Sequence, residues 1–178
     1  MKANELAAAA IIAASVGNRE CLKSVRVLPD RLVSCDGSIL CRIKTKTENA
    51  PPEGILLPVA ADKDFLKMVS KKNYAKEVKL TQSPIGDVTL SCGGTSVTAT
   101  RVEGRYPDVA FVLGKMEPRS EKISMQVNPE LLIRVRDALR LLGLASTTGY
   151  TLATAFGPEG EYIWDLENAL FIAMPLRG

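Results

Sequence analysis

The sequence predicts an α+β fold in which one unit, a helix followed by three short antiparallel strands, occurs three times. Apolar residues recur at helical spacing in three separate segments, which predicts three amphipathic helices. Each of these segments is followed by short runs rich in apolar residues, several of them alternating, that end at turn-forming residues, as strands in hairpins do. The order of elements restarts about every 55–60 residues, a period that indicates internal repeats.

The first unit opens with a helix expected over residues 3–16, because Gly17 suits the left-handed position that follows many helices. A tight hairpin is expected at Asp36 and Gly37, two residues that favour such turns. The expected strands of this unit are residues 22–28, 31–35 and 38–44. A polar segment with two prolines, residues 45–53, then connects to the second unit.

The second unit begins with an apolar strand at residues 54–59. Asp62 is expected to cap a helix that runs from Lys63 to about Asn73, because aspartate side chains accept hydrogen bonds from free amides at helix starts. The expected strands are residues 77–82, 87–92 and 95–102, with turns at 84–86 and 93–94.

The third unit follows a linker at residues 114–121 and starts with a strand at 122–127. Asn128 is expected to cap the next helix, with Pro129 at its first position and Gly143 after its last residue, Leu142. The expected strands are residues 149–156, 161–165 and 169–174.

Composition argues against several classes of function. The chain has 178 residues, a formal net charge of +3 and no histidine, so the commonest general base and metal ligand is missing. Its four cysteines lack the spacing of zinc or redox motifs and are expected to be reduced thiols of a cytoplasmic protein: Cys21, Cys35, Cys41 and Cys92. No acidic pair or glycine-rich loop has the spacing of a catalytic or phosphate site. We expect no enzymatic activity, no metal, no cofactor, no export and no membrane insertion.

Four short motifs lie at defined places relative to the repeats. They are Cys-Asp-Gly-Ser-Ile-Leu at 35–40, the apolar strand at 54–58, Glu-Gly-Arg-Tyr-Pro-Asp at 103–108 and Ala-Met-Pro-Leu-Arg at 173–177. Three of them resemble the Thr-Asp-Gly-His-Arg-Leu, Asp-Gly-Arg-Phe-Pro-Asp and Val-Met-Pro-Met-Arg segments of the bacterial DNA sliding clamps, the beta subunit of DNA polymerase III. The first motif lacks the family's His and Arg. The strand at 54–58 resembles the one that leads into the second helix of the family's domain.

The resemblance implies a shortened, DNA clamp-like protein of about one and a half domains. Residues 1–113 are similar to a complete middle domain with two units, and residues 122–178 to half of the last domain, with one unit. Clamps of this family close around duplex DNA as rings of twelve such units. Three units per chain therefore predict a homo-oligomer, a tetrameric ring.

The resemblance also implies that the helices face DNA phosphates without reading sequence. The basic residues expected there are Lys63, Lys67, Lys71, Arg134, Arg136 and Arg140. The three lysines are spaced by four and so share one face of the expected helix. The alternative is that they form a solvated surface without a partner. The alanine-rich first helix has few charges and is expected to pack against a neighbouring subunit.

A cleft for a partner peptide is implied between the first and third units. The matching residues are Cys35, Gly37, Ile39, Leu40, Pro107, Val112, Ile172, Met174, Pro175, Leu176 and Arg177. Apolar side chains and the adaptable thioether of methionine suit a pocket for peptide anchors. The alternative is that the same residues complete the protein's own core.

The predicted function is that of a sliding-clamp-like processivity factor, which binds or encircles duplex DNA and tethers a polymerase or another replication protein. The main alternative is a regulator or mimic that binds replication proteins without encircling DNA. An enzyme would need a titratable cluster, and the sequence shows none.

Overall fold

The computed structural model describes residues 1–13, 19–109, 127–144, 155–156 and 161–175. Strands in this part form two antiparallel sheets. The larger sheet contains, in spatial order, β4 (Ile55–Pro58), β1 (Ser24–Val27), β2 (Arg31–Cys35), β3 (Ile39–Lys44), β10 (Ala169–Ala173), β9 (Tyr162–Asp165) and β8 (Ala155–Phe156). The smaller sheet contains β5 (Lys79–Gln82), β6 (Asp87–Cys92) and β7 (Thr95–Thr100).

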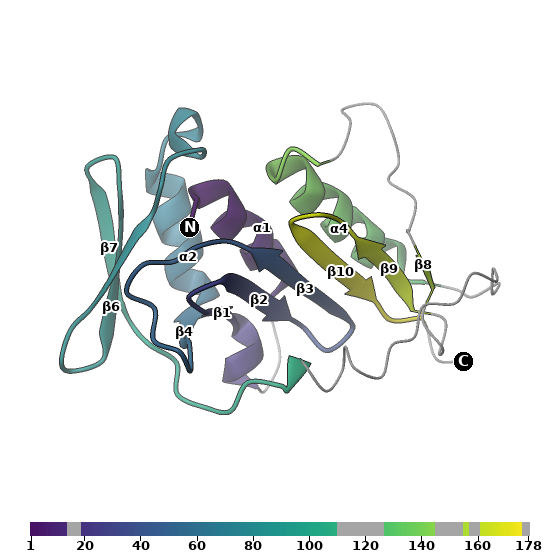
Figure 1. Ribbon diagram of the computed structural model, residues 1–178, viewed down its shortest axis with the longest axis horizontal. Coiled ribbons are helices and arrows are strands. Elements are labelled where there is room, and N and C mark those ends of the chain that lie inside the picture. The colour runs from purple at the N-terminus through teal and green to yellow at the C-terminus, as the bar shows by residue number, and fades with distance from the viewer. Residues whose placement is uncertain (14–18, 110–126, 145–154, 157–160, 176–178) are drawn as a thin grey trace.

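The α-helices are α1 (Ala3–Ile12), α2 (Val59–Met68) and α4 (Pro129–Leu141), with short 3₁₀ turns η1 (Glu20–Lys23) and η2 (Lys71–Asn73). In Figure 1 the α-helices form a layer behind the large sheet, and the small sheet with β6 and β7 lies at the left, beside α2. Helix α1 contacts both α2 and α4 and lies against β2 and β3. Ala8 and Ala9 are fully buried, because side chains this small let two helices and a sheet approach the same helix closely. The alanine-rich surface is thus used inside the chain, which corrects the expectation that it packs against a neighbouring subunit.

The first two units exchange their leading segments. Strand β4, which precedes α2, pairs antiparallel with β1 of the first unit, from Ile55 opposite Val27 to Pro58 opposite Ser24. In return, the segment that precedes α1 lies beside the second unit: Lys2 forms a β-bridge with Glu77, and Val78 N donates to Met1 O at 2.8 Å. Each unit therefore completes the sheet of the other.

The first and third units share one continuous sheet through their last strands. Strand β10 pairs antiparallel with β3, from Ala169 opposite Ile43 to Ala173 opposite Ile39. Because side chains alternate along a strand, Phe171 joins the core under the helices while Ile172 faces the opposite side of the sheet. The third unit is therefore fixed to the first by backbone pairing and by burial together.

The structure confirms the α+β class and the three helix-plus-strand units, and corrects several boundaries. Helix α2 begins at Val59, four residues before the predicted start, so Asp62 is a buried residue within the helix and not its cap. Because α2 ends at Met68, Lys71 belongs to η2 and does not continue the lysine face of the helix. The predicted linker at 114–121 and strand segment 122–126 lie outside the described residues.

Helix α4 is where prediction and structure agree most closely. The Asn128 side chain accepts a hydrogen bond from Glu130 N at 3.0 Å, and Pro129 occupies the first helical position, as predicted. Gly143 has a φ of 71°, the left-handed conformation expected after the end of a helix. These local signals fix both ends of the helix to within one residue.

Candidate functional site

Basic side chains lie on two of the three helices in the layer. Lys63 and Lys67 on α2 and Arg140 on α4 are exposed, and Arg136 on α4 is half-buried. Lys67 forms an ion pair with Asp64 at 3.0 Å, and Arg136 forms one with Asp137 at 2.8 Å. Since both pairs are well exposed, they hold their cations weakly and leave them free to exchange partners.

An apolar groove of about 350 Å³ lies between these helices. Its floor consists of small and aliphatic side chains of α1 together with Leu66, Tyr74 and Leu141. Lys63 and Lys67 also line it. Two of the predicted DNA-facing lysines therefore lie together on the helical layer, while the side chain of Lys71 lies outside the part of the structure that is described.

Arg134 has a different role from the one that the sequence predicted. Its guanidinium donates to Ile11 O at 3.0 Å and to Ala13 O at 3.3 Å, and it forms an ion pair with Asp36. These bonds satisfy carbonyls at the C-terminus of α1, which α-helices otherwise leave without partners. Because its side chain is only 21% exposed and fully engaged within the chain, Arg134 is not part of the candidate DNA surface.

Asp36 anchors the turn between β2 and β3. Its Oδ1 accepts hydrogen bonds from Ser38 N at 2.8 Å and from Ile39 N at 2.9 Å, while Oδ2 accepts from Arg134. Gly37 has a φ of 99°, so a side chain at this position would strain the turn. The hydrogen bonds and the ion pair of Asp36 thus fix the turn. In addition, Met174 N, just beyond β10, donates to Ser38 O at 2.8 Å.

The outer face of the large sheet brings several predicted cleft residues together. Leu40 on β3 and Ile172 on β10 are directly opposite each other. They form a buried cluster with Ile163 and Leu170, none of them more than 7% exposed, and the partly buried Cys35 packs against this cluster. Leu170 and Ile163 were not predicted, although the alternation of β10 places Leu170 on the same face as Ile172.

Ile39 does not belong to this cluster. It is 1% exposed and packs in the core on the helix side of the sheet, because it alternates with Leu40. Gly37 is exposed, and Pro107, Met174 and Pro175 are partly buried. Val112, Leu176 and Arg177 lie outside the described residues.

Two further residues cover the outer face beside the cleft. Tyr106 is buried against Val33 and Leu56, and Val109 contacts both this group and the cluster around Leu40. Burial raises the pKa of the Tyr106 hydroxyl and of the Cys35 thiol, so both groups are neutral at physiological pH. Cys35 is therefore a packing residue and not a reactive thiolate.

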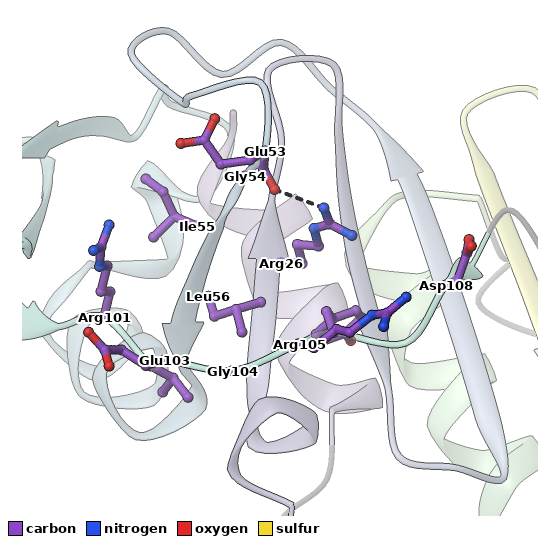
Figure 2. A pocket seen from close by; sticks show the side chains of 12 residues that line it. Arg26, Glu53, Gly54, Ile55, Leu56, Arg101, Glu103, Gly104, Arg105 and Asp108 are labelled. Carbon is purple, nitrogen blue, oxygen red and sulfur yellow. Dashed lines mark hydrogen bonds between the residues drawn. The ribbon is translucent and has the colours of Figure 1, made fainter.

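A larger cavity, of about 640 Å³, lies further along the outer side of the molecule (Figure 2). Arg26 on β1 donates to Glu53 O at 2.8 Å at its margin. Its other wall is the segment after β7, where Val102 N donates to Leu56 O at 2.9 Å and so covers the free edge of β4. Arginine and acidic side chains both line this cavity, so it has no single electrostatic preference.

Within the described residues, no group of three or more acidic, histidine or cysteine side chains is placed to hold a metal ion. No helix in the same part of the chain has the length and apolarity needed to cross a membrane.

The fold is that of the bacterial DNA sliding clamps. The chain is similar to the sliding clamp of Bacillus subtilis, with 12% identity and a TM-score of 0.67. It is similar to the DNA polymerase III beta subunit of Thermotoga maritima, with 9% identity and a TM-score of 0.69. It is also similar to the sliding clamp of Caulobacter crescentus, with 15% identity and a TM-score of 0.63.

These similarities cover 99–100% of this chain but only 62–65% of the other chains. By sequence, no family model and no curated protein matches the chain. The similarity therefore establishes the fold alone and leaves function to be argued from the site.

Proposed function

We propose that the protein is a clamp-like processivity factor, which binds duplex DNA without sequence preference and tethers a polymerase or other replication protein. It acts without catalysis and without a cofactor. The observation that carries this proposal is that the two sides of the molecule differ in character. Exposed basic side chains lie on the helical layer, and an apolar cluster lies on the outer face of the sheet.

The helical layer suits loose contact with phosphates. Apart from Arg134, four basic residues of the predicted set have described side chains that are exposed or only partly buried: Lys63, Lys67, Arg136 and Arg140. Long cationic side chains attract a polyanion of any sequence, and contacts of this kind are lost and regained easily. They would allow the protein to slide along DNA while staying close to it.

Assembly into a ring would convert weak contacts into lasting association. The clamps that this fold resembles form rings of twelve units, and four chains of three units supply that number. A closed ring holds DNA by topology, so that no tight bond is needed. We therefore propose a homotetramer with the helices toward the centre.

The outer cleft is the proposed site for a partner peptide. The buried side chains of Leu40, Ile172 and Leu170 would form its floor, and the partly buried Met174 follows β10 beside the turn that Asp36 holds. An apolar floor beside a fixed turn can accept one or two apolar anchors of an extended peptide.

The DNA-binding part of the proposal is tested by fluorescence anisotropy with duplexes of unrelated sequence over a range of salt concentrations. We expect equal affinities for all duplexes and a steep fall with salt, because each phosphate contact contributes about −0.9 to the logarithmic slope. In K67E/R136E the slope should weaken by about two units.

A matched control is K79E/R101E, which makes the same change of charge at exposed residues away from the helical layer. Equal losses in both double variants would contradict a DNA surface on the helices. Binding of a replication protein without any affinity for duplex DNA would instead favour a regulator.

A further inference from the structure

The last strands of the first two units occupy equivalent places. In the first unit the sheet runs from the leading strand β4 through β1 and β2 to β3. In the second it runs from the bridge at Lys2 through β5 and β6 to β7. Helix α1 packs on β3, and α2 packs on β7. Strand β7 is therefore the counterpart of β3.

The counterpart strands differ in what lies beside them. Strand β3 pairs with β2 on one side and with β10, the last strand of the third unit, on the other. Strand β7 pairs with β6 alone among the described residues. The last strands of the first and third units thus pair with each other. The last strand of the second unit has no pairing partner on its outer side within the described chain.

Two other strand edges among the described residues, those of β4 and β5, are covered by the chain itself. Leu56 O on β4 accepts from Val102 N at 2.9 Å. Beside β5, Asn49 Nδ2 donates to Leu80 O at 3.3 Å, and Gln82 Nε2 donates to Asn49 O at 3.2 Å. No backbone bond of this kind reaches the outer edge of β7 from the described residues.

The composition of β7 permits pairing with another strand. Residues 95–100 read Thr-Ser-Val-Thr-Ala-Thr, without a charge or a proline, whereas edge strands that must stay single commonly carry lysine or proline. Lys79 on β5 and Ser96 on β7 both lie opposite Ser91 of β6, so they occupy the same row of residues across the sheet. In this row β5 carries a lysine and β7 does not. Threonine side chains also pair favourably across strands.

We propose that β7 pairs antiparallel with β7 of a second copy of this chain across a two-fold axis, extending the small sheet as β10 extends the large one. A second β7 is the favoured partner because β3 and β10 of every copy already pair with each other. The same patch then serves both subunits, as a two-fold interface requires. This inference deepens the proposed self-assembly and rests on it.

The test compares self-association of the wild-type chain, S96K/T98K and T81K by sedimentation equilibrium. Thr98 and Thr81 occupy one row of the sheet, both opposite Thr89, so T81K gives β5 two lysines in the same rows. Like charges facing each other across the two-fold axis should raise the dissociation constant of S96K/T98K by about tenfold or more. T81K should associate as the wild type does.

Hydrogen exchange of the wild-type chain provides a second measurement that needs no variant. We expect amides in residues 96–100 to become protected as the concentration rises through the association range, while those in β5 do not change. Unchanged association of S96K/T98K, or no concentration-dependent protection in β7, would overturn this pairing. Neither result would affect the affinity for duplex DNA, which tests the proposed function separately.

Discussion

At the scale of single residues, the environment of Asp62 is unfavourable for a charged carboxylate. Its carboxyl group is fully buried in α2, and neither oxygen has a hydrogen-bond partner among the described residues. Burial raises the pKa well above the ordinary aspartate value of 3.8, because an apolar environment disfavours the charged form. The folded protein therefore prefers the neutral acid.

This preference predicts how stability depends on pH. The contribution of Asp62 is fully present below pH 3.8 and is lost as the pH rises through the raised pKa of the folded state. Asp62→Leu should raise the free energy of unfolding at neutral pH by about 1–3 kcal/mol and flatten its decline with pH. Urea denaturation at several pH values measures both effects, and the exposed Asp64→Leu serves as control. A steeper decline in D62L would contradict this account.

Arg134 gives a prediction of opposite sign. Replacing it with Met leaves Asp36 and the carbonyls at the end of α1 without a charged donor. We expect a loss of about 1–3 kcal/mol in unfolding free energy, as for hydrogen bonds to charged groups that are partly buried. Arg136→Met on the same helix removes an exposed ion pair and should cost much less. Equal stabilities of the two variants in urea titrations would refute the role assigned to Arg134.

At the scale of elements, the sequence predicts best where the determining signals are local. Strands β2 and β6 match their predicted ranges, and α4 is fixed by Asn128, Pro129 and Gly143. Asp62 was misinterpreted as a cap because aspartate is a common cap, whereas the chain enters α2 directly from β4 at Pro58. Tertiary packing of α2 overrides the local preference of aspartate for the cap position.

The candidate site is predictable only in part for a related reason. Alternation along β3 and β10 places Leu40 and Ile172 on one face of the sheet. The same alternation places Ile39 on the other face, and the motif comparison did not take this into account. The ion pair of Arg134 with Asp36 joins residues 98 positions apart. No local pattern of charge or hydrophobicity contains such a contact.

The cleft proposed at the end of β10 gives a prediction for partner binding. Met174→Glu places a charge beside the apolar cluster of Leu40 and Ile172. We expect the affinity for a clamp-binding polymerase peptide to fall by about tenfold or more, since an unpaired carboxylate opposes an apolar anchor. Isothermal calorimetry measures the affinity. Ile85→Glu, at a highly exposed turn between β5 and β6, is the control, and equal affinities in both variants would exclude Met174 from the cleft.

At the scale of the whole molecule, the three units are joined by two exchanged leading segments and by one pair of last strands. The helices lie in one layer, with the large sheet in front of them and the small sheet beside α2 (Figure 1). Pairing of β7 with a second copy would join two chains through last strands, as β3 and β10 join two units within the chain. The proposed β7 pairing therefore repeats a kind of strand contact that the chain already uses.

Retention on circular DNA tests this account most directly. The protein is incubated with a nicked circular plasmid and any loading factor it requires, and the complex is isolated by gel filtration in salt that suppresses phosphate contacts. We predict that the protein stays with the circle and is released when a restriction enzyme makes the DNA linear. Release from both forms at the same rate, or retention on the linear DNA, would contradict a ring that encircles the duplex.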